Sequence, residues 1–223
     1  MSTRPSAADI PYTVRRSTRA RRVRVSVHAQ GGVEVVLPAR APERAAAAAV
    51  SELRPWIEGR LDEAREALAL IAARAGTVPY LGRALELVPQ RGRTRVHRDG
   101  ECLLVPEGDA RAAVERYYRR AARKEIAPRL DNAAALAGLS YKDLTIRGQR
   151  TRWASCSTTG RMSFNWRLLL APEQVVEYVV WHEVCHLEIL DHSPRFWKLL
   201  ERRWPGYRDD RDWLSRHGAT LVL

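Results

Sequence analysis

The sequence predicts an α+β fold with a β-rich N-terminal part followed by a mostly helical C-terminal part. Apolar and polar residues alternate over 23–27 and resume over 33–37, on either side of a Gly-Gly turn, which is typical of a β-hairpin. Short apolar runs separated by Gly and Pro continue from Val78 to Val105. Six of the seven tryptophans follow residue 150, so we expect the best-packed core to be C-terminal.

Two long helical segments are expected in the first two thirds of the chain. One spans 42–74 and is predicted to break near Pro55. The other begins at Asp109, a favoured N-cap residue, and carries apolar residues at helical spacing. Pro128 is predicted to interrupt this second helix and Gly138 to end it.

The last third is predicted to pass from strands to helices. Residues 144–168 have strand-like composition around a Thr-Thr-Gly turn. Pro172 is placed to open a helix that we expect to reach about Leu190. A short helix should follow Ser193-Pro194, and another is expected at 209–216.

These elements suggest a flexible terminus over 1–11, a β-rich part with a helical insertion over 12–108, and a separate C-terminal part over 109–223. No apolar run reaches the length of a membrane span, and the N-terminus lacks the apolar core of a signal peptide. The three cysteines form no C-x-x-C pair. We therefore expect a cytoplasmic protein that does not bind membranes.

The chain is strongly basic, with a formal net charge of +12 and a pI near 10.4. Such a charge favours acidic or nucleic-acid partners, although 35 arginines against 3 lysines also indicate a compositional bias. Two groups of arginines occur without an intervening acid and are the best candidates for DNA or RNA contact: Arg15, Arg16, Arg19, Arg21, Arg22 and Arg24, and then Arg147, Arg150, Arg152, Arg161 and Arg167.

The strongest chemical motif is H-E-x-x-H at residues 182–186. On a helix, His182 and His186 are one turn apart on the same face, so both imidazoles can bind one metal ion. Glu183 lies between them and can accept a proton from a water at that metal. The opposite face of this helix is rich in valine and can pack into a core.

A catalytic zinc usually has three protein ligands and one open position. His192 is the preferred third ligand because Ser193-Pro194 predicts a helix start, which leaves His192 in a loop that can fold back. Glu188 and Asp191 are rival ligands. Cys185 faces sideways on the helix and is interpreted as a packing residue.

The sequence HEVCHLEILDHSPRFW resembles the signature of the YgjP-like metallopeptidase family, zincin-type proteins related to the SprT-like and WLM groups. The stretch 150–157, RTRWASCS, is similar to the family's R-x-R-W-G-S-C-S, with Ala154 where glycine is usual. NWRL at 165–168 and the P-x-x-V-x-x-Y pattern at 172–178 also match, and 19–37 resembles the family's N-terminal hairpin. The resemblance covers most of 12–218.

This resemblance implies a zincin-like C-terminal part and one zinc ion per chain, held by His182, His186 and His192. It implies that Glu183 is the acid/base in peptide hydrolysis, with a protein or peptide as substrate. The matching motifs supply the candidates for substrate binding, namely Arg152, Trp153, Ser155, Asn165 and Tyr178.

Two features of the cleft remain open in the sequence. Residues 161–168 are either an edge strand to which an extended substrate adds or an ordinary paired strand. Tyr178, Tyr207 and His217 are candidates for the oxyanion stabiliser by residue type alone.

Three other functions are considered as alternatives to the zinc peptidase. The histidine spacing is also that of metzincins, but Ile189 replaces their glycine and no methionine follows the motif. It also resembles YbeY-like endoribonucleases, although Glu183 replaces their glycine. A zinc-containing binding module without turnover is the third possibility. The relation to SprT-like proteins, together with the arginines, suggests action on nucleic-acid-associated proteins.

Overall fold

A computed structural model of the chain describes residues 10–28, 31–149 and 151–223. The prediction for the first eleven residues falls almost entirely outside these ranges, as does Arg150. The chain forms two compact units, Met1–Ala73 and Arg74–Leu223, which we call the N-terminal and C-terminal units. Each unit begins with strands and ends with helices, which confirms the predicted α+β class.

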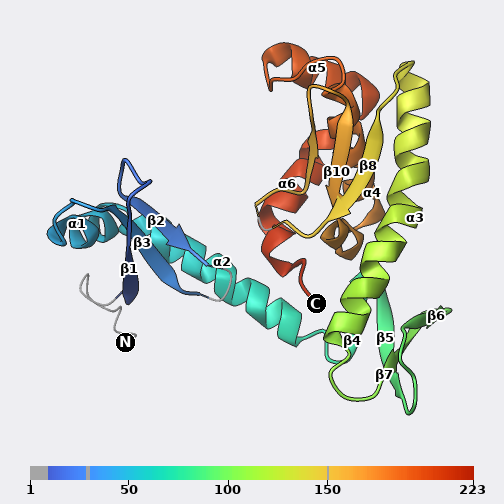
Figure 1. Ribbon diagram of the computed structural model, residues 1–223, viewed down its shortest axis with the longest axis horizontal. Helices are drawn as coiled ribbons and strands as arrows, with labels where there is room; N and C mark the ends of the chain where they lie inside the picture. The colour runs from blue at the N-terminus through green and yellow to red at the C-terminus, as the bar shows by residue number, and fades with distance from the viewer. Residues whose placement is uncertain (1–9, 29–30, 150) are drawn as a thin grey trace. The chain divides into compact units, whose positions relative to one another are not determined.

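The N-terminal unit contains a three-stranded sheet in the order β1-β3-β2 (Figure 1). Strands β2 (Arg24–Val27) and β3 (Val33–Pro38) pair antiparallel, as the alternation of valines predicts. Strand β1 (Tyr12–Ser17) pairs parallel to β3 and was not predicted. Its side chains are almost all exposed, so its sequence carries no alternation between buried and polar positions.

Two helices cover this sheet. They are α1 (Arg44–Glu52) and α2 (Arg54–Ala72), separated at Leu53, so the predicted break occurs with Pro55 in the first turn of α2. The core of the unit is small and aliphatic. Its buried members are Val33, Val35, Leu37, Ala46, Val50 and Ile57.

The C-terminal unit begins with a four-stranded sheet in the order β4-β5-β7-β6 (Figure 1). Its strands are β4 (Thr77–Tyr80), β5 (Arg83–Gln90), β6 (His97–Asp99) and β7 (Cys102–Pro106). They match the short β-like runs in the sequence. The Leu81 amide donates to the Leu169 carbonyl at 2.8 Å, which ties this sheet to the segment before the histidine-bearing helix.

Helix α3 (Arg111–Ala137) runs through Pro128 without interruption, so the predicted break is wrong. Ile126 and Leu130, on either side of the proline, are fully buried, and this packing offsets the roughly 3 kcal/mol that an internal proline costs. The side chain of Arg129 donates to the Glu125 carbonyl at 2.7 Å, in the turn that precedes the proline. Gly138 ends the helix in a left-handed conformation, as predicted.

A second sheet has the order β8-β10-β9 (Figure 1). Strand β10 (Arg161–Asn165) is central, parallel to β8 (Asp143–Arg147) and antiparallel to β9 (Ala154–Cys156). Of the two possibilities for 161–168, the paired strand is therefore correct and the edge strand is wrong. The edge positions belong to β8 and β9. A 3₁₀ helix, η1 (Trp166–Leu170), follows β10.

Helix α4 (Glu173–Cys185) carries the H-E-x-x-H motif, and it stops five residues before the predicted end at Leu190. The Leu187 and Glu188 amides bond carbonyls three residues back, which tightens the chain into a turn after Cys185. The predicted short helices are present as α5 (Pro194–Arg203) and α6 (Tyr207–His217), and a 3₁₀ turn, η2 (Gly218–Thr220), follows. Within the described ranges, no helix has the length and apolar character needed to cross a bilayer.

The C-terminal unit has one continuous core between its sheets and helices, with aromatic side chains at its centre. Tyr118, Phe164, Trp166 and Phe196 are the largest side chains that are fully buried there. This distribution confirms the predicted C-terminal position of the best-packed core. Helix α4 packs against α3, α5, α6 and β9, so the chain surrounds the motif with regular structure.

Candidate metal centre and active site

Three histidines converge on one point of the C-terminal unit. His182 lies in the last turn of α4, His186 caps that helix, and His192 lies in the loop before α5. The His182 Nε2 atom is 3.2 Å from His186 Nε2 and 2.9 Å from His192 Nε2. Their ligand atoms all lie within 4.8 Å of one another. The loop does fold back, as the Ser193-Pro194 signal predicts.

These spacings fit a shared metal ion. Tetrahedral zinc with Zn–N bonds of about 2.05 Å holds its nitrogen ligands about 3.3 Å apart. The Nδ1 of His186 is 3.0 Å from the Ile189 carbonyl, and a proton on Nδ1 satisfies that oxygen and leaves the Nε2 lone pair free. Three imidazoles leave a fourth position of a tetrahedral ion open.

Burial keeps two of the imidazoles neutral. Burial is the main reason that the pKa of His182 falls to about 3, and the neighbouring His186 and His192 contribute to this shift. Burial also lowers the pKa of His186, partly opposed by the Ile189 carbonyl. Neutral imidazoles are the form that binds metal ions, so this environment prepares the site for a cation at neutral pH.

An aromatic side chain that the sequence analysis missed supports all three rings. Phe196 of α5 is fully buried, and its ring centroid lies 4.9 Å from that of His182, 4.6 Å from that of His186 and 4.8 Å from that of His192. The ring of Trp197 lies 5.6 Å from that of His192. The signal was present in the sequence, because both aromatics sit in the first turn of the helix that follows the third histidine.

Glu183 is buried between the histidines and strand β9. Its carboxylate accepts the backbone N–H of Cys156, while its Oε2 has no hydrogen-bond partner among the described residues. Burial raises the pKa of Glu183 to about 8, opposed by the Cys156 amide and by the charge of Arg152. A carboxyl group in this environment is poised to exchange a proton near neutral pH.

The rival ligands are engaged elsewhere. Glu188 forms an ion pair with Arg203, and Asp191 accepts the Ser193 amide at 3.0 Å. Cys185 is fully buried, as its interpretation as a packing residue requires, and Arg203 Nη1 lies 3.7 Å from its sulfur. The described part of the chain therefore offers one metal-binding cluster, made of the three histidines.

The predicted substrate-binding residues separate into two groups. Tyr178 lies one turn before His182, with the two ring centroids 5.9 Å apart, and burial raises the pKa of Tyr178 to about 12. Ser155 lies on β9 and Arg152 just before it, where its charge acts on Glu183. Tyr178 and Arg152 therefore lie near the histidines and Glu183, and Ser155 lies on the strand that packs against α4.

The other two serve the local structure. Asn165 is buried, and its amide nitrogen donates to the Gln149 and Arg152 carbonyls at 2.7 and 3.2 Å. Its oxygen accepts the Arg167 amide, so the side chain fixes the loop that precedes β9. The ring of Trp153 packs closely against Gly218, where an added Cβ would lie 3.0 Å from the indole.

The other two candidates for the oxyanion stabiliser stack on tryptophan rings. Tyr207 stacks on Trp197, with ring centroids 5.6 Å apart, and is buried. His217 stacks on Trp213 at 4.7 Å, and its Nδ1 lies 3.0 Å from the Trp213 carbonyl. Among the three candidates, Tyr178 is the one whose ring contacts a histidine of the cluster.

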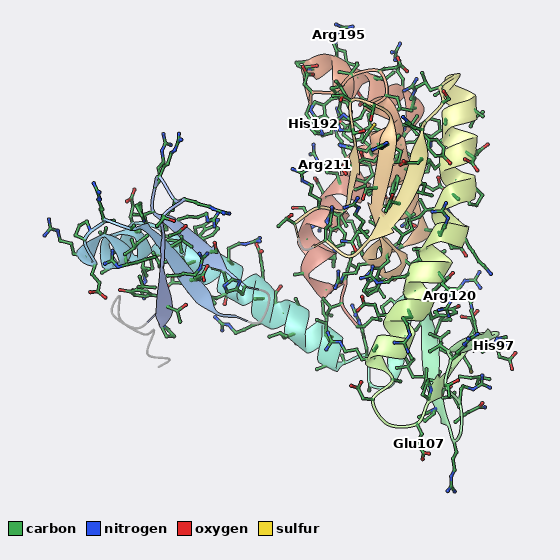
Figure 2. The ribbon with its side chains drawn as sticks, viewed as in Figure 1. His97, Glu107, Arg120, His192, Arg195 and Arg211 are labelled. Carbon is green, nitrogen blue, oxygen red and sulfur yellow. The ribbon has the colours of Figure 1, made fainter. Side chains whose placement is uncertain are left out.

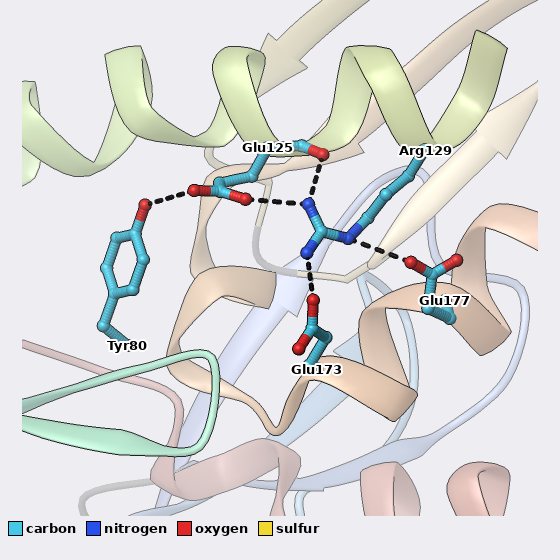
Figure 3. Close-up of polar contacts among 5 residues, drawn as sticks. All are labelled: Tyr80, Glu125, Arg129, Glu173 and Glu177. Atoms are coloured by element: carbon cyan, nitrogen blue, oxygen red, sulfur yellow. Dashed lines mark hydrogen bonds and ion pairs between the residues drawn. The ribbon is translucent and has the colours of Figure 1, made fainter. Parts of the chain in front are cut away.

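An ion-pair network anchors the N-terminal half of α4 (Figure 3). Arg129 of α3 pairs with Glu177 at 3.0 Å, with Glu125 at 2.7 Å and also with Glu173. Tyr80 of β4 donates to Glu125 at 3.0 Å. Two carboxylates of α4 are thus bound to a side chain of α3, and this fixes the start of the helix whose last turn carries His182 and Glu183.

Comparison with known proteins agrees with this site. A family model described as the YgjP-like metallopeptidase domain matches residues 21–217. The chain belongs to the YgjP-like metallopeptidase family. It is therefore a metal-dependent peptidase, a hydrolase, and the three-histidine cluster lies within the matched region.

One solved structure, the "Crystal structure of the metallopeptidase zymogen of Pyrococcus abyssi abylysin", is 24% identical, with a TM-score of 0.37. The match covers 40% of this YgjP-like chain and 90% of the other chain. No curated protein matches the chain at a significant level.

Proposed function

We propose that this chain is a zinc peptidase that binds one zinc ion through His182, His186 and His192. The observation that carries the proposal is the convergence of the three imidazoles, with Nε2 atoms 3.2 and 2.9 Å apart. A set of three imidazoles with an open position suits zinc among the common divalent metals.

The chemistry divides between the metal and the chain. Bound zinc supplies a Lewis acid that polarises the scissile carbonyl and lowers the pKa of water toward 7. Glu183 takes a proton from the attacking water and passes it to the leaving amine. Its surroundings suit both transfers, because the Cys156 amide orients the carboxylate and its Oε2 is free to receive the proton. Tyr178 is our choice for stabilising the oxyanion, because its ring lies against His182.

The edge of β9 is the proposed position of the substrate backbone. The Trp153 carbonyl accepts the Asn165 amide, and the Ser157 amide donates to the Arg161 carbonyl. The backbone groups of every second residue of this segment therefore point toward β10. Ala154 and Cys156 point their backbone groups the other way, and the Cys156 amide reaches Glu183. An extended peptide that pairs with Ala154 would bring its carbonyl groups beside Glu183.

The test compares wild type with Glu183→Gln, both loaded with zinc, on an unstructured protein. We expect hydrolysis to fall by a factor of about 10² to 10⁴ while the zinc content stays the same. His186→Ala should lose both zinc and activity. Glu188→Gln is the matched control, since it removes a nearby carboxylate that is paired with Arg203, and it should stay active. Loss of zinc from Glu183→Gln would make Glu183 a structural residue instead.

RNA presented in parallel tests the alternatives. Cleavage of RNA without proteolysis would favour an endoribonuclease of the YbeY type over the peptidase. Binding of zinc with no cleavage of any substrate would favour a binding module. Family membership and the presence of Glu183 favour the peptidase over both.

A second proposal concerns nucleic acid, and a hollow in the N-terminal unit supports it. Its volume is about 450 Å³, and its lining includes Arg15, Arg19, Arg21, Arg22 and Arg24. Of these, Arg15 pairs with Glu34 at 2.9 Å, and no other ion pair to the set occurs within the described ranges. Arginine forks of this kind bind phosphate groups. We infer that the unit contacts nucleic-acid backbone and that the peptidase acts on associated proteins.

A further inference from the structure

An arginine that the proposed chemistry does not use lies beside the three histidines. The guanidinium carbon of Arg211, on α6, is 5.5 Å from the ring centroid of Trp197 and 5.9 Å from that of Tyr207. The Trp197 ring is in turn 5.6 Å from His192 and 6.1 Å from His182. One aromatic ring therefore separates the guanidinium from the metal-binding cluster. Figure 2 shows Arg211 and His192 on the same side of the C-terminal unit.

The stacked rings of Trp197 and Tyr207 fix the position of the Arg211 guanidinium. The two rings are nearly parallel, at 20°, and Tyr207 is buried. A guanidinium held over an aromatic face keeps its N–H groups at the periphery, where they can form a two-pronged bond to a carboxylate. The aromatic stack thus holds the cation in place without occupying its donors.

The donors of Arg211 are weakly engaged. Its ion pair within the described ranges is with the adjacent Asp212 at 3.3 Å, and both side chains are about half exposed. Such a pair contributes little and exchanges readily with solvent. Arg208, one turn earlier on α6, differs because it holds Glu201 at 2.6 Å. The two arginines share a helix and an aromatic neighbour, Tyr207, but only Arg211 lies over Trp197.

The acidic groups around the cluster have partners of their own, among them Asp191, whose carboxylate accepts the Ser193 amide at 3.0 Å. Asp210 accepts the Trp204 indole N–H at 2.7 Å and is buried, and Glu188 is paired with Arg203. Arg152 adds a second positive charge that acts on Glu183. The positive charge of Arg211 also extends to Tyr178, where it opposes the effect of burial on the pKa. The surroundings of the cluster therefore favour a negatively charged ligand.

We propose that Arg211 is a specificity residue that binds a carboxylate of the peptide substrate. The carboxylate belongs either to an Asp or Glu side chain next to the scissile bond or to the C-terminus of a short peptide. This inference rests on the proposed peptidase function of the same site. It makes acidic peptides the preferred substrate class and adds a contact outside the hydrolytic chemistry.

Binding of four ligands to the zinc-loaded full chain tests the inference without turnover. Each ligand is a dipeptide with an N-terminal hydroxamate, which chelates zinc, and the four combine Glu or Gln with a free or amidated C-terminus. Calorimetry should give about tenfold tighter binding when the recognised carboxylate is present, the effect of one charge-assisted pair. The Glu/Gln comparison and the acid/amide comparison identify which carboxylate is recognised.

Variants then assign the preference to one side chain. Arg211→Gln should remove the tenfold preference and leave binding of the Gln amide ligand unchanged, because the hydroxamate contact does not involve Arg211. Arg211→Lys should restore part of the preference, since the charge remains but the fork is lost. Arg208→Gln is the matched control and should keep it entirely.

The outcomes separate this inference from the proposed function. Equal binding of all four ligands to the wild type, or a preference that survives Arg211→Gln, overturns the specificity assignment alone. Failure of every hydroxamate to bind overturns the zinc site, and the inference fails with it.

Discussion

The two units of this chain have cores of different kinds. The N-terminal unit buries a few aliphatic side chains, whereas the C-terminal unit fully buries Tyr118, Phe164, Trp166 and Phe196. Rigid aromatic rings fill space with few rotatable bonds, and Phe196 holds three imidazoles in place directly. The metal-binding cluster therefore lies in the unit whose core can fix the orientation of side chains.

Charged residues are also arranged differently in the two units. In the N-terminal unit, residues 10–28 carry six arginines and no acid, while α2 carries four acidic and three basic residues, so the charges are separated. In the C-terminal unit, Arg129 and Arg203 are paired with carboxylates close to α4. Charge therefore orders the active-site helix in one unit, whereas in the other it leaves a group of arginines of which only Arg15 has an ion pair within the described ranges.

Phe196→Ala should have the largest effect. Removal of a fully buried phenylalanine costs about 3–5 kcal/mol in the free energy of unfolding. Zinc affinity should also fall, by about tenfold to a hundredfold, because the three rings lose their common support. Denaturant unfolding and competition with a chromophoric chelator measure the two effects. Phe196→Leu is the control, and it should retain most of both properties. Unchanged zinc affinity in Phe196→Ala would show that the rings are held by other contacts.

Ile57→Ala tests whether the small core is independent of the site. This side chain is fully buried in the N-terminal unit, so its truncation should cost about 3 kcal/mol. We expect zinc affinity and peptide hydrolysis of the folded protein to stay unchanged, since the two cores share no buried residue. Leu68→Ala, at a 42% exposed position of the same helix, is the matched control with little effect. A loss of zinc binding in Ile57→Ala would contradict the independence of the metal site from the N-terminal core.

Arg129→Met addresses the charge pairing around α4. The substitution leaves Glu173, Glu177 and Glu125 without their shared partner, and we expect a loss of about 2 kcal/mol because these carboxylates are only partly buried. Chemical denaturation of the metal-free protein gives the value. Arg116→Gln, at an exposed position of the same helix, should change stability by less than about 0.5 kcal/mol. Equal effects of the two substitutions would mean that the network does not stabilise the fold.

The metal site follows from the sequence more directly than its support does. A helix fixes the relation between His182 and His186 by its period alone, and Ser193-Pro194 marks the turn that returns His192. The position of Phe196 in the first turn of α5 is visible in the sequence, but its contact with all three rings, like the place of Arg211, depends on how α5 and α6 pack against α4. Sequence spacing therefore predicts the ligand candidates, and tertiary packing determines the side chains around them.

One wrong prediction and one open alternative in the fold have the same physical origin. Pro128 was expected to break α3, but Ile126 and Leu130 anchor the helix on both sides of it. The segment 161–168 was open between an edge and a paired strand, and its pairing partner is the distant strand β8, with Arg161 opposite Asp143. In both cases long-range contacts decide the outcome, and a local propensity cannot represent them.

The smallest effect on stability, and the sharpest test of the comparison, comes from the arginines of the N-terminal unit. Arg19, Arg21 and Arg22 line the hollow, and within the described ranges no ion pair holds them. Changing all three to Gln should alter the free energy of unfolding by less than about 0.5 kcal/mol, because no partner is lost. If they bind phosphates, each substitution should reduce the slope of log affinity against log salt by about 0.7 for single-stranded DNA or 0.9 for duplex.

Fluorescence anisotropy with labelled DNA at several salt concentrations gives these slopes. Arg60→Gln and Arg65→Gln are the matched controls, because both arginines belong to α2 and are paired with acids there. The double control should leave the slope unchanged. A triple variant with the wild-type slope would show that these arginines are only a solvated surface, and the proposed binding role of the N-terminal unit would be lost.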